Sequence, residues 1–325
     1  MVTVSGKFEL ANPGESFTLA EMDVEVIDLK FQGVEGGIAS FLVRGPDGWI
    51  LVETGPESTR GTLLESLAAR GIAPGDLKAV FVTHIHLDHA GASGWFAQQG
   101  VPVHVHPRGA RHLVDPGRLV ESARSVYGER FDPLWGGMPA APAESVRPIA
   151  DGATVSVAGL SVTALDTPGH AFHHHAYLIG GDCFAGDAAG ARLADSDYLS
   201  ATSAPPQFHL EMTLSSLDRI AAVAPERLFL THFGPVSDVS AHLRDYRDAV
   251  GLNAEFVRQR MAEGLDAEAL AVAYEAFQLQ QAQRLGLSAE RWRDYQAING
   301  TGMCATGIRM YWEARLAEER QAKES

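Results

Sequence analysis

The sequence has few cysteines and fewer basic residues than acidic ones. Its 325 residues include only Cys183 and Cys304 as cysteines, which cannot form the disulfide framework of a small secreted fold. Lysine and arginine number 26 against 41 aspartate and glutamate residues, so the formal net charge is −15. A chain this acidic repels phosphate backbones and anionic lipid headgroups, which argues against nucleic acid and membranes as partners. We therefore expect reduced thiols and a cytoplasmic location.

Long apolar runs and low-complexity tracts are absent as well. No segment reaches the length of a transmembrane helix, and residues 1–15 lack the charged start and apolar run of a signal peptide. Hydrophobic residues make up 46% of the chain and charged residues 21%, which is enough apolar material for a large core. The length predicts one large domain, or one domain with a smaller accessory part.

The hydrophobic pattern divides the chain into a strand-rich part, residues 1–235, and a helical part, residues 236–325. Short β-rich segments such as 38–44 and 79–82 alternate with helical periodicity in the first part, and only helical periodicity remains in the second. Residues 108–148 interrupt the alternation with five prolines. We interpret them as a long irregular insertion that is either a packed connection or a cap over a pocket.

Thirteen histidines are present, and they are concentrated around one motif. The segment 84–89, His-Ile-His-Leu-Asp-His, directly follows the predicted buried strand 79–82. In extended chain, residues two apart point the same way, so His84 and His86 can converge on one point. Asp88 and His89 lie at the turn into a helix and can face a second point nearby. Imidazole nitrogens and carboxylate oxygens are ligands that zinc and similar metals prefer, so the motif predicts a metal site.

Three later strands also end in a residue of the metal-ligand type. The ligand-type residues at these strand ends are His170, Asp187 and His232. Sites in sheets of mixed α/β proteins gather where strands end, so four such ends predict a single shared site.

These motifs together resemble the metallo-β-lactamase superfamily. The matching segments are HIHLDH at 84–89, TPGH at 167–170, GD at 186–187 and THFGP at 231–235. The resemblance covers roughly residues 20–240, and the glyoxalase-II-like and lactonase-like hydrolases look most similar. It implies an α+β fold, an αββα sandwich of two face-to-face sheets with helices outside. Residues 1–235 would then form the catalytic domain, with residues 236–325 as a C-terminal helical extension.

The resemblance also implies a dinuclear metal centre. It assigns His84, His86 and His170 to the first metal, assigns Asp88, His89 and His232 to the second, and makes Asp187 the bridge. Two divalent ions are implied, with zinc favoured and manganese, iron or cobalt as alternatives. A hydroxide between them would attack an acyl carbonyl. Asp88 would in addition act catalytically, by orienting the nucleophile or by giving a proton to the leaving group.

The chain departs from the family pattern at several positions. The usual Asp-Thr-Gly after an early strand is Glu53-Thr54-Gly55 here, so Glu53 is interpreted as a supporting acid rather than a ligand. The tyrosine that acyl-homoserine lactonases carry soon after the bridging aspartate is missing, since the next tyrosine is Tyr198. Asp187 stands where some β-lactamases have a cysteine ligand, and Cys183 lies within a predicted strand.

The remaining histidines are interpreted mostly as structural. His104 and His106 alternate along a strand, and a structural role at the sheet edge is favoured over a second metal site. His174 matches a position that supports a ligand in the family, while His173 and His175 are interpreted as rim or core residues. His112, His209 and His242 are isolated and are expected at the surface or at helix caps.

Four functions are compared. A dinuclear hydrolase of an ester, thioester or lactone is favoured, with a small molecule as substrate and a homodimer expected. A mononuclear-iron oxidoreductase of the persulfide-dioxygenase type is the alternative, and the metal count separates the two. A phosphodiesterase or nuclease is disfavoured by the charge of −15. A non-catalytic binding module is disfavoured by the complete ligand set.

Overall fold

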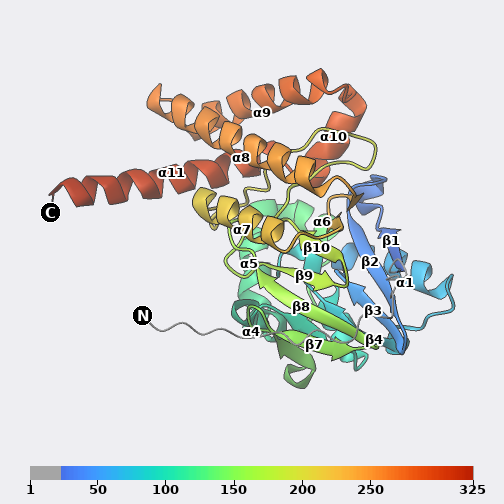
Figure 1. The fold of residues 1–325 in the computed structure, drawn as a ribbon. Helices are drawn as coiled ribbons and strands as arrows, with labels where there is room; N and C mark the ends of the chain where they lie inside the picture. The colour runs from blue at the N-terminus through green and yellow to red at the C-terminus, as the bar shows by residue number, and fades with distance from the viewer. Residues whose placement is uncertain (1–22, 325) are drawn as a thin grey trace, which may run out of the picture.

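Two six-stranded β-sheets face each other and carry helices on their outer sides (Figure 1). The computed structural model describes residues 23–324. The first sheet has the order β1-β2-β3-β4-β5-β6, formed by β1 (Val24–Asp28), β2 (Ala39–Gly45), β3 (Gly48–Val52), β4 (Leu77–Phe81), β5 (Val103–Val105) and β6 (Val146–Pro148). The second has the order β12-β11-β10-β9-β8-β7, formed by β7 (Thr154–Val157), β8 (Leu160–Asp166), β9 (His175–Ile179), β10 (Asp182–Gly186), β11 (Arg227–Leu230) and β12 (Gly234–Val236). This arrangement confirms the predicted sandwich.

Strand direction brings several carboxyl ends to one edge of the molecule. Strands β3 to β6 are parallel to one another, and β1–β2 and β2–β3 are antiparallel pairs. In the second sheet β10 and β11 are parallel, and β8 runs in the same direction because β9 is antiparallel to both β8 and β10. The loops after β8, β10 and β11 therefore leave the second sheet at the same edge.

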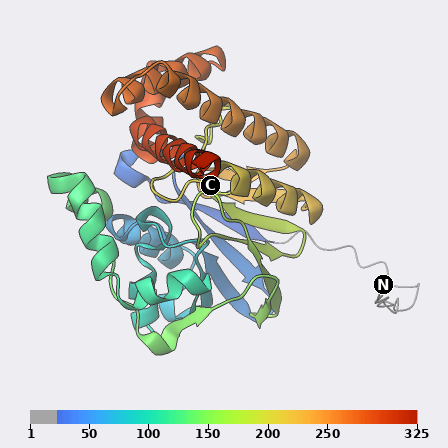
Figure 2. The same cartoon turned by 90° about the vertical axis from the view of Figure 1, so that its left-hand side faces the viewer.

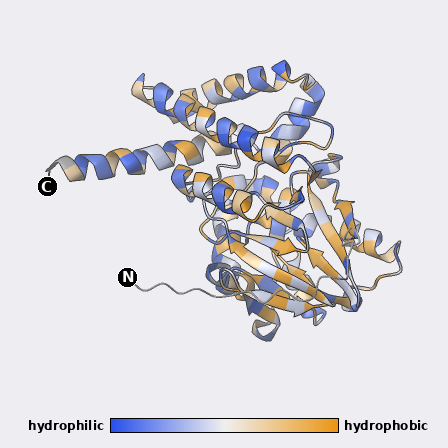
Figure 3. Ribbon diagram, viewed as in Figure 1, coloured by the Kyte–Doolittle hydropathy of each residue, from blue (hydrophilic) through white to orange (hydrophobic). Residues whose placement is uncertain are grey.

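Aromatic side chains fill the space between the sheets. Phe41 of β2 contacts Phe184 and Phe229 edge-on, with ring centroids 5.5 and 5.4 Å apart. Phe81 of β4 contacts Tyr177 of β9 at 5.2 Å, and the Tyr177 hydroxyl donates a hydrogen bond to the Val82 carbonyl at 3.0 Å. Hydrophobic residues run along the strands of both sheets, whereas α8 and α11 carry many hydrophilic ones (Figure 3).

Helices cover the outer faces of both sheets. They are α1 (Arg60–Ala68), α2 (Leu87–Ala90), α3 (Ser93–Gln98), α4 (Pro107–Val114), α5 (Gly117–Tyr127), α6 (Phe131–Trp135), α7 (Leu210–Ala222), α8 (Val239–Ala262), α9 (Ala267–Arg284), α10 (Ala289–Ile298) and α11 (Thr301–Glu324). Within residues 23–324, none of these helices combines the length and apolar character needed to cross a bilayer.

Residues 108–148 are more regular than the sequence predicts. They hold most of α4, all of α5 and α6, and the short strand β6, so the interpretation as an irregular insertion is wrong. Pro107 is the first residue of α4, Pro116 is the N-cap of α5, and Pro133 lies in the first turn of α6. Proline is tolerated at these positions because the amide groups there have no partner within the helix.

The C-terminal helices share one hydrophobic core with the second sheet. Tyr246 of α8 and Ile308 of α11 are buried in the same cluster as Leu228 and Leu230 of β11. Asp238 caps α8 by accepting a hydrogen bond from the Ala241 amide at 3.0 Å. Helix α11 packs against α8 and α9, and its C-terminal end extends away from the sandwich (Figure 1). The boundary at residue 235 stays a prediction.

Candidate metal centre

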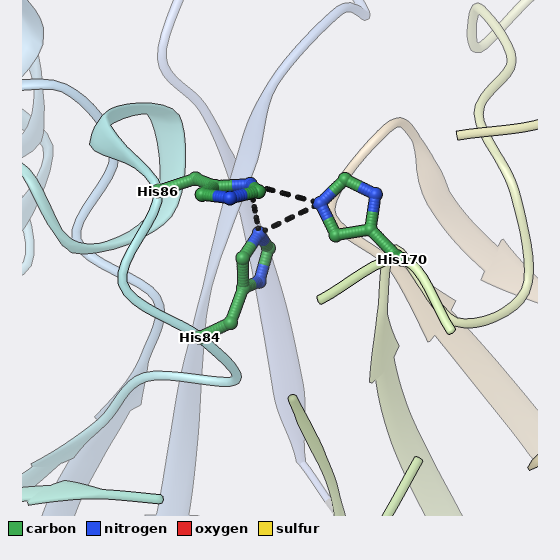
Figure 4. Close-up of side chains that lie close together, drawn as sticks. All are labelled: His84, His86 and His170. Carbon is green, nitrogen blue, oxygen red and sulfur yellow. Dashed lines mark hydrogen bonds between the residues drawn. The ribbon is translucent and has the colours of Figure 1, made fainter. Parts of the chain in front are cut away.

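Three histidine nitrogens from two loops converge on one point (Figure 4). His84 and His86 follow the carboxyl end of β4, and His170 follows β8. Nε2 of His84 lies 3.0 Å from Nδ1 of His86, and Nε2 of His170 lies 3.2 and 2.9 Å from these two nitrogens. The structure thus brings together the three residues assigned to the first metal.

A second group forms beside the first from α2 and the loop after β11. Because α2 begins at Leu87, Asp88 and His89 lie in its first turn. Oδ2 of Asp88 is 3.6 Å from Nε2 of His89 and 3.4 Å from Nε2 of His232. These are the three residues assigned to the second metal, and their ligand atoms lie close enough to bind one ion.

Asp187 lies between the two groups. Its Oδ2 is 3.4 Å from Nε2 of His170, and its Oδ1 is 3.2 Å from Nε2 of His89 and 3.6 Å from Nε2 of His232. One carboxylate oxygen therefore faces each group, which is the geometry expected of a bridging ligand.

The donor atoms fit a pair of metal ions. Nε2 of His89 and Oδ1 of Asp187 are buried, and although they lie 3.2 Å apart neither has a hydrogen-bond partner in suitable geometry, which is costly unless another group binds them. Burial and the neighbouring histidines lower the pKa of His84 and His86 well below the usual value, so both remain in the neutral, ligating form. Burial raises the pKa of Asp88, but His89 and His232 outweigh it and lower that pKa to about 2.

Backbone and side-chain acceptors fix the orientation of four of the five histidine rings. Nδ1 of His170 donates to the Thr202 carbonyl at 2.8 Å, and Nδ1 of His232 donates to the Gly37 carbonyl at 3.1 Å. Nδ1 of His84 lies 3.1 Å from the Thr83 hydroxyl, and Nδ1 of His89 lies 3.2 Å from Oε1 of Glu53. A proton on Nδ1 leaves Nε2 free to ligate, as in other histidine metal sites.

Glu53 supports the centre from outside the ligand groups. The side chain is fully buried at the end of β3 and accepts hydrogen bonds from the hydroxyls of Thr83 and Thr231. Its Oε1 also contacts His89, so one carboxylate links the ends of three strands. The structure therefore places Glu53 in the supporting role interpreted from the sequence.

His174 positions the backbone that carries Asp187. Its Nε2 accepts a hydrogen bond from the Asp187 amide at 3.1 Å, and its Nδ1 lies 2.8 Å from the Thr167 hydroxyl. Gly186, just before Asp187, has φ of +51°, and a Cβ there would lie 2.5 Å from Oγ1 of Thr83 and 2.7 Å from Nε2 of His174. Only glycine therefore allows this approach.

The histidines outside the centre have separate roles. His104 stacks on Phe81 with ring centroids 4.5 Å apart. His106 caps α4 because its Nδ1 accepts a hydrogen bond from the Arg108 amide at 3.0 Å. The neutral His106 ring then carries its proton on Nε2, which lies 3.4 Å from Oδ1 of Asp166. Nε2 of His175 lies 2.6 Å from the same oxygen. Hydrogen bonding accounts for this cluster, in line with the structural role favoured from the sequence.

One of the three isolated histidines contradicts its prediction. His242 is buried and hydrogen-bonds through Nε2 to the Ala189 carbonyl at 2.8 Å, so its expected place at the surface or a cap is wrong. His209 caps α7, as expected for a capping residue. His112 is half-buried and, like the buried His173, lines a cavity beside the ligand groups.

This cavity, of about 730 Å³, opens over the two ligand groups. Its walls come from α5, from residues 202–207 and from residues 296–303. Tyr127 of α5 lines it together with Asp88, and burial and the Asp88 charge raise the pKa of its phenol. The sequence offered residues 108–148 as a cap over a pocket but did not identify which of their side chains line it. The usable signal was the four-residue repeat of Arg118, Ser122 and Val126, which places them on one side of a helix.

Comparisons with known proteins agree with this geometry. A family model described as the metallo-beta-lactamase superfamily matches residues 33–232. The chain is 46% identical over 69 residues to a rat protein named metallo-beta-lactamase domain-containing protein 1, an alignment covering 21% of this chain and 28% of the rat protein. It is 27% identical over 180 residues to the hydroxyacylglutathione hydrolase of Thiobacillus denitrificans, covering 54% of this chain and 52% of that protein. The chain thus spans about half or less of the length of these two curated relatives.

A solved structure with a similar fold covers nearly the whole chain. It is a metallo-beta-lactamase family protein from Thermus thermophilus, with a TM-score of 0.63 and 22% sequence identity. The match covers 90% of this chain and 93% of that protein. At this identity the similarity establishes the fold.

Proposed function

Because the chain belongs to the metallo-β-lactamase superfamily, we propose that it is a hydrolase that cleaves an ester, thioester or lactone bond with two divalent metal ions. His84, His86 and His170 would hold one ion, Asp88, His89 and His232 would hold the other, and Asp187 would contact both. The observation that carries the proposal is the position of Asp187, which faces one histidine group with each carboxylate oxygen. A site for one ion would not need such an arrangement.

The chain's own residues supply the surroundings for acyl transfer to water. When bound, the two ions would lower the pKa of water and polarise a carbonyl oxygen. Asp88 lines the cavity with 19% of its side chain exposed, so it can contact both a second ion and a substrate. At its lowered pKa the carboxylate is ionised at neutral pH and can orient a water molecule by accepting its hydrogen bond.

The relatives support the chemistry in general terms. The superfamily consists mostly of metal-dependent hydrolases, and one relative is named for the hydrolysis of a thioester-type substrate, a hydroxyacylglutathione. Zinc is the proposed metal, since five imidazoles and two carboxylates are a borderline-hard donor set. The cytoplasmic location and the homodimer stay predictions.

The test is the metal content per chain, measured by plasma emission on protein purified without added metal. It is combined with hydrolysis assays on generic lactones and thioesters, with and without a chelator. About two ions per chain and chelator-sensitive hydrolysis are expected. One iron per chain with no hydrolysis would refute the proposal and favour the oxidoreductase alternative. The Asp248→Asn variant removes an exposed carboxylate of α8, far from the ligand groups in sequence, and it should keep both the metal content and the hydrolysis of the parent protein.

A further inference from the structure

The walls of the cavity have the opposite charge from the chain as a whole. Apart from Asp88 and Asp187 at its floor, the charged residues that line the cavity are Arg118 and Arg130. No other aspartate and no glutamate lines it within the described part of the chain, although acidic residues outnumber basic ones by 41 to 26 in the sequence. Since two bound cations would make the floor positive as well, the whole cavity would attract anions.

Helix α5 and the turn that follows it present the two arginines. Arg118, Ser122 and Val126 of α5 follow each other at four-residue steps and so lie on one side of the helix. The helix ends before Gly128, whose φ is +55°, and Arg130 lines the same cavity from the short 3-10 helix Gly128–Arg130. Figure 2 shows α5, in green, at the side of the sandwich and near the C-terminal helices.

The other arginine of α5, Arg124, has structural partners. It lies outside the cavity and forms a bidentate pair with Asp132, at 3.0 and 2.6 Å. It also lies over the Phe131 ring, 4.2 Å from the centroid. By contrast, the side chains of Arg118 and Arg130 form neither a hydrogen bond nor an ion pair with any other residue between 23 and 324. Their charge therefore has no structural partner in this part of the chain.

Apolar side chains line the same cavity as the arginines and the metal-ligand groups. Val126 has 74% of its surface exposed and Met303 has 37%, and both line the cavity. Exposed apolar side chains in a cavity lose their contact with water when a ligand with an apolar part binds. The cavity therefore combines cationic and exposed apolar side chains with the metal-ligand groups.

We propose that the substrate is an acyl compound whose non-reacting end carries an anionic group, a carboxylate or a phosphate, bound by Arg118 and Arg130. Its apolar middle would contact Val126 and Met303 while the reacting carbonyl lies at the metal-ligand groups. The inference deepens the proposed function and rests on it for the place of the reacting bond. Because both arginines are exposed, salt would screen the contribution of the anion site.

Binding measurements test the anion site without relying on activity. Calorimetry on the metal-containing protein would compare suberate with octanoate, which have the same chain length and differ by one carboxylate. Either ligand can direct one carboxylate to the metals, but only suberate has a second for the arginines. We expect suberate to bind about five- to tenfold more tightly at low salt. The preference for suberate over octanoate should shrink in 0.5 M salt. Binding of 6-phosphonohexanoate would show whether the site favours phosphate-like groups over carboxylate.

The matched variants are Arg118→Gln/Arg130→Gln and Arg108→Gln. Arg108 is an exposed arginine of the neighbouring α4 that does not line the cavity, so its variant should keep the preference for suberate. The double variant should bind the two ligands equally well. Equal binding by the unmodified protein, or a preference that survives in the double variant, would overturn the proposal.

A kinetic comparison separates this inference from the proposed hydrolase function. The S-phenyl thioester of suberic acid and the same thioester carrying a methyl ester at its far end differ only in the distal charge. We expect the acid to have the higher kcat/KM, and the double variant to lose that advantage. If neither thioester is cleaved but suberate is still preferred in binding, the hydrolase proposal fails and the anion site stands. Cleavage of both at the same rate, with equal binding, refutes the anion site alone.

Discussion

The backbone amide of Asp187 donates a hydrogen bond to Nε2 of His174 across 3.1 Å. This contact links the carboxylate between the two ligand groups to a fully buried histidine that lies outside them. The ring is held in turn by the Thr167 hydroxyl at Nδ1. The place of the bridging carboxylate therefore depends on a hydrogen-bond chain as well as on the ligands themselves.

The first prediction concerns this hydrogen-bond chain. Replacing His174 with Ala should weaken metal binding by about 10- to 100-fold, the usual loss when a group that orients a ligand is removed. Competition with a chromophoric chelator measures the affinity, and circular dichroism reports whether the protein remains folded. His174→Gln should recover part of the affinity, because its side-chain oxygen can accept the same hydrogen bond. Unchanged affinity in the alanine variant would contradict the positioning role.

The second prediction concerns the bridging carboxylate itself. Asp187→Asn should lower the metal content from about two ions per chain to one or fewer. The amide nitrogen cannot ligate, and the oxygen that remains is neutral and cannot serve both groups. Hydrolysis should fall by more than about 100-fold, because several kcal/mol of charge stabilisation in the transition state depend on the metals. Metal analysis and steady-state kinetics measure both effects. Two tightly bound ions in this variant would show that Asp187 is not a bridge.

The third prediction concerns Gly186. A Cβ at this position would approach Thr83 and His174 to within 2.7 Å, and φ of +51° is unfavourable for alanine. Gly186→Ala should lower the free energy of unfolding by about 2 kcal/mol or more. Urea denaturation measures the change. Gly251→Ala is the matched control, because that glycine lies within α8 and an added Cβ meets nothing within 4 Å, so the variant should be as stable as the parent or more so.

The fourth prediction is a dependence of stability on pH through His104. Burial, with a smaller contribution from Arg147, lowers the pKa of His104 to about 4. The unfolded chain takes up a proton near the usual pKa, at about pH 6.5, whereas the folded protein does so only near pH 4. The contribution of neutral His104 to the free energy of unfolding is therefore fully present above about pH 6.5. It decreases as the pH falls toward 4, by on the order of 2 kcal/mol.

His104→Phe tests this contribution. Phenylalanine keeps the stacking on Phe81, and Nδ1 of His104 has no hydrogen-bond partner to lose. Urea denaturation at pH 7 and pH 5 should show a smaller loss of stability in the variant than in the parent protein. An identical pH dependence in the parent and the His104 variant would contradict the prediction.

Sequence alone was sufficient to find the residues of the candidate metal centre. The ligand-type residues stand directly after buried strands, and the strand-helix alternation sends these strand ends to a common edge. The positions of His84, His86 and His170 therefore follow from a local pattern, repeated along the chain. The resemblance to the superfamily distinguished Glu53 from the ligands, because Glu53 stands where the family usually has an aspartate.

The helices of residues 107–135 could not be predicted in the same way. A proline that begins a helix and a proline that breaks one are alike in sequence, and only the surrounding contacts show that Pro107 and Pro133 lie in first turns. The sequence offered residues 108–148 as a cap over a pocket, but it could not show how the cavity is built, because its walls combine α5 with residues 202–207 and 296–303, which are distant in sequence.

The sequence by itself determined which side chains can ligate a metal, through the residue types at the end of each strand, and its resemblance to the metallo-β-lactamase superfamily predicted the two-sheet sandwich. Only the tertiary structure decided the partners of the other histidines. His104 stacks on a ring from the neighbouring strand β4, His106 and His175 share Asp166, and His242 is buried against the loop at Ala189. Alternation along a strand shows which side a residue faces, but the element packed against that side is set by chain segments far away in sequence.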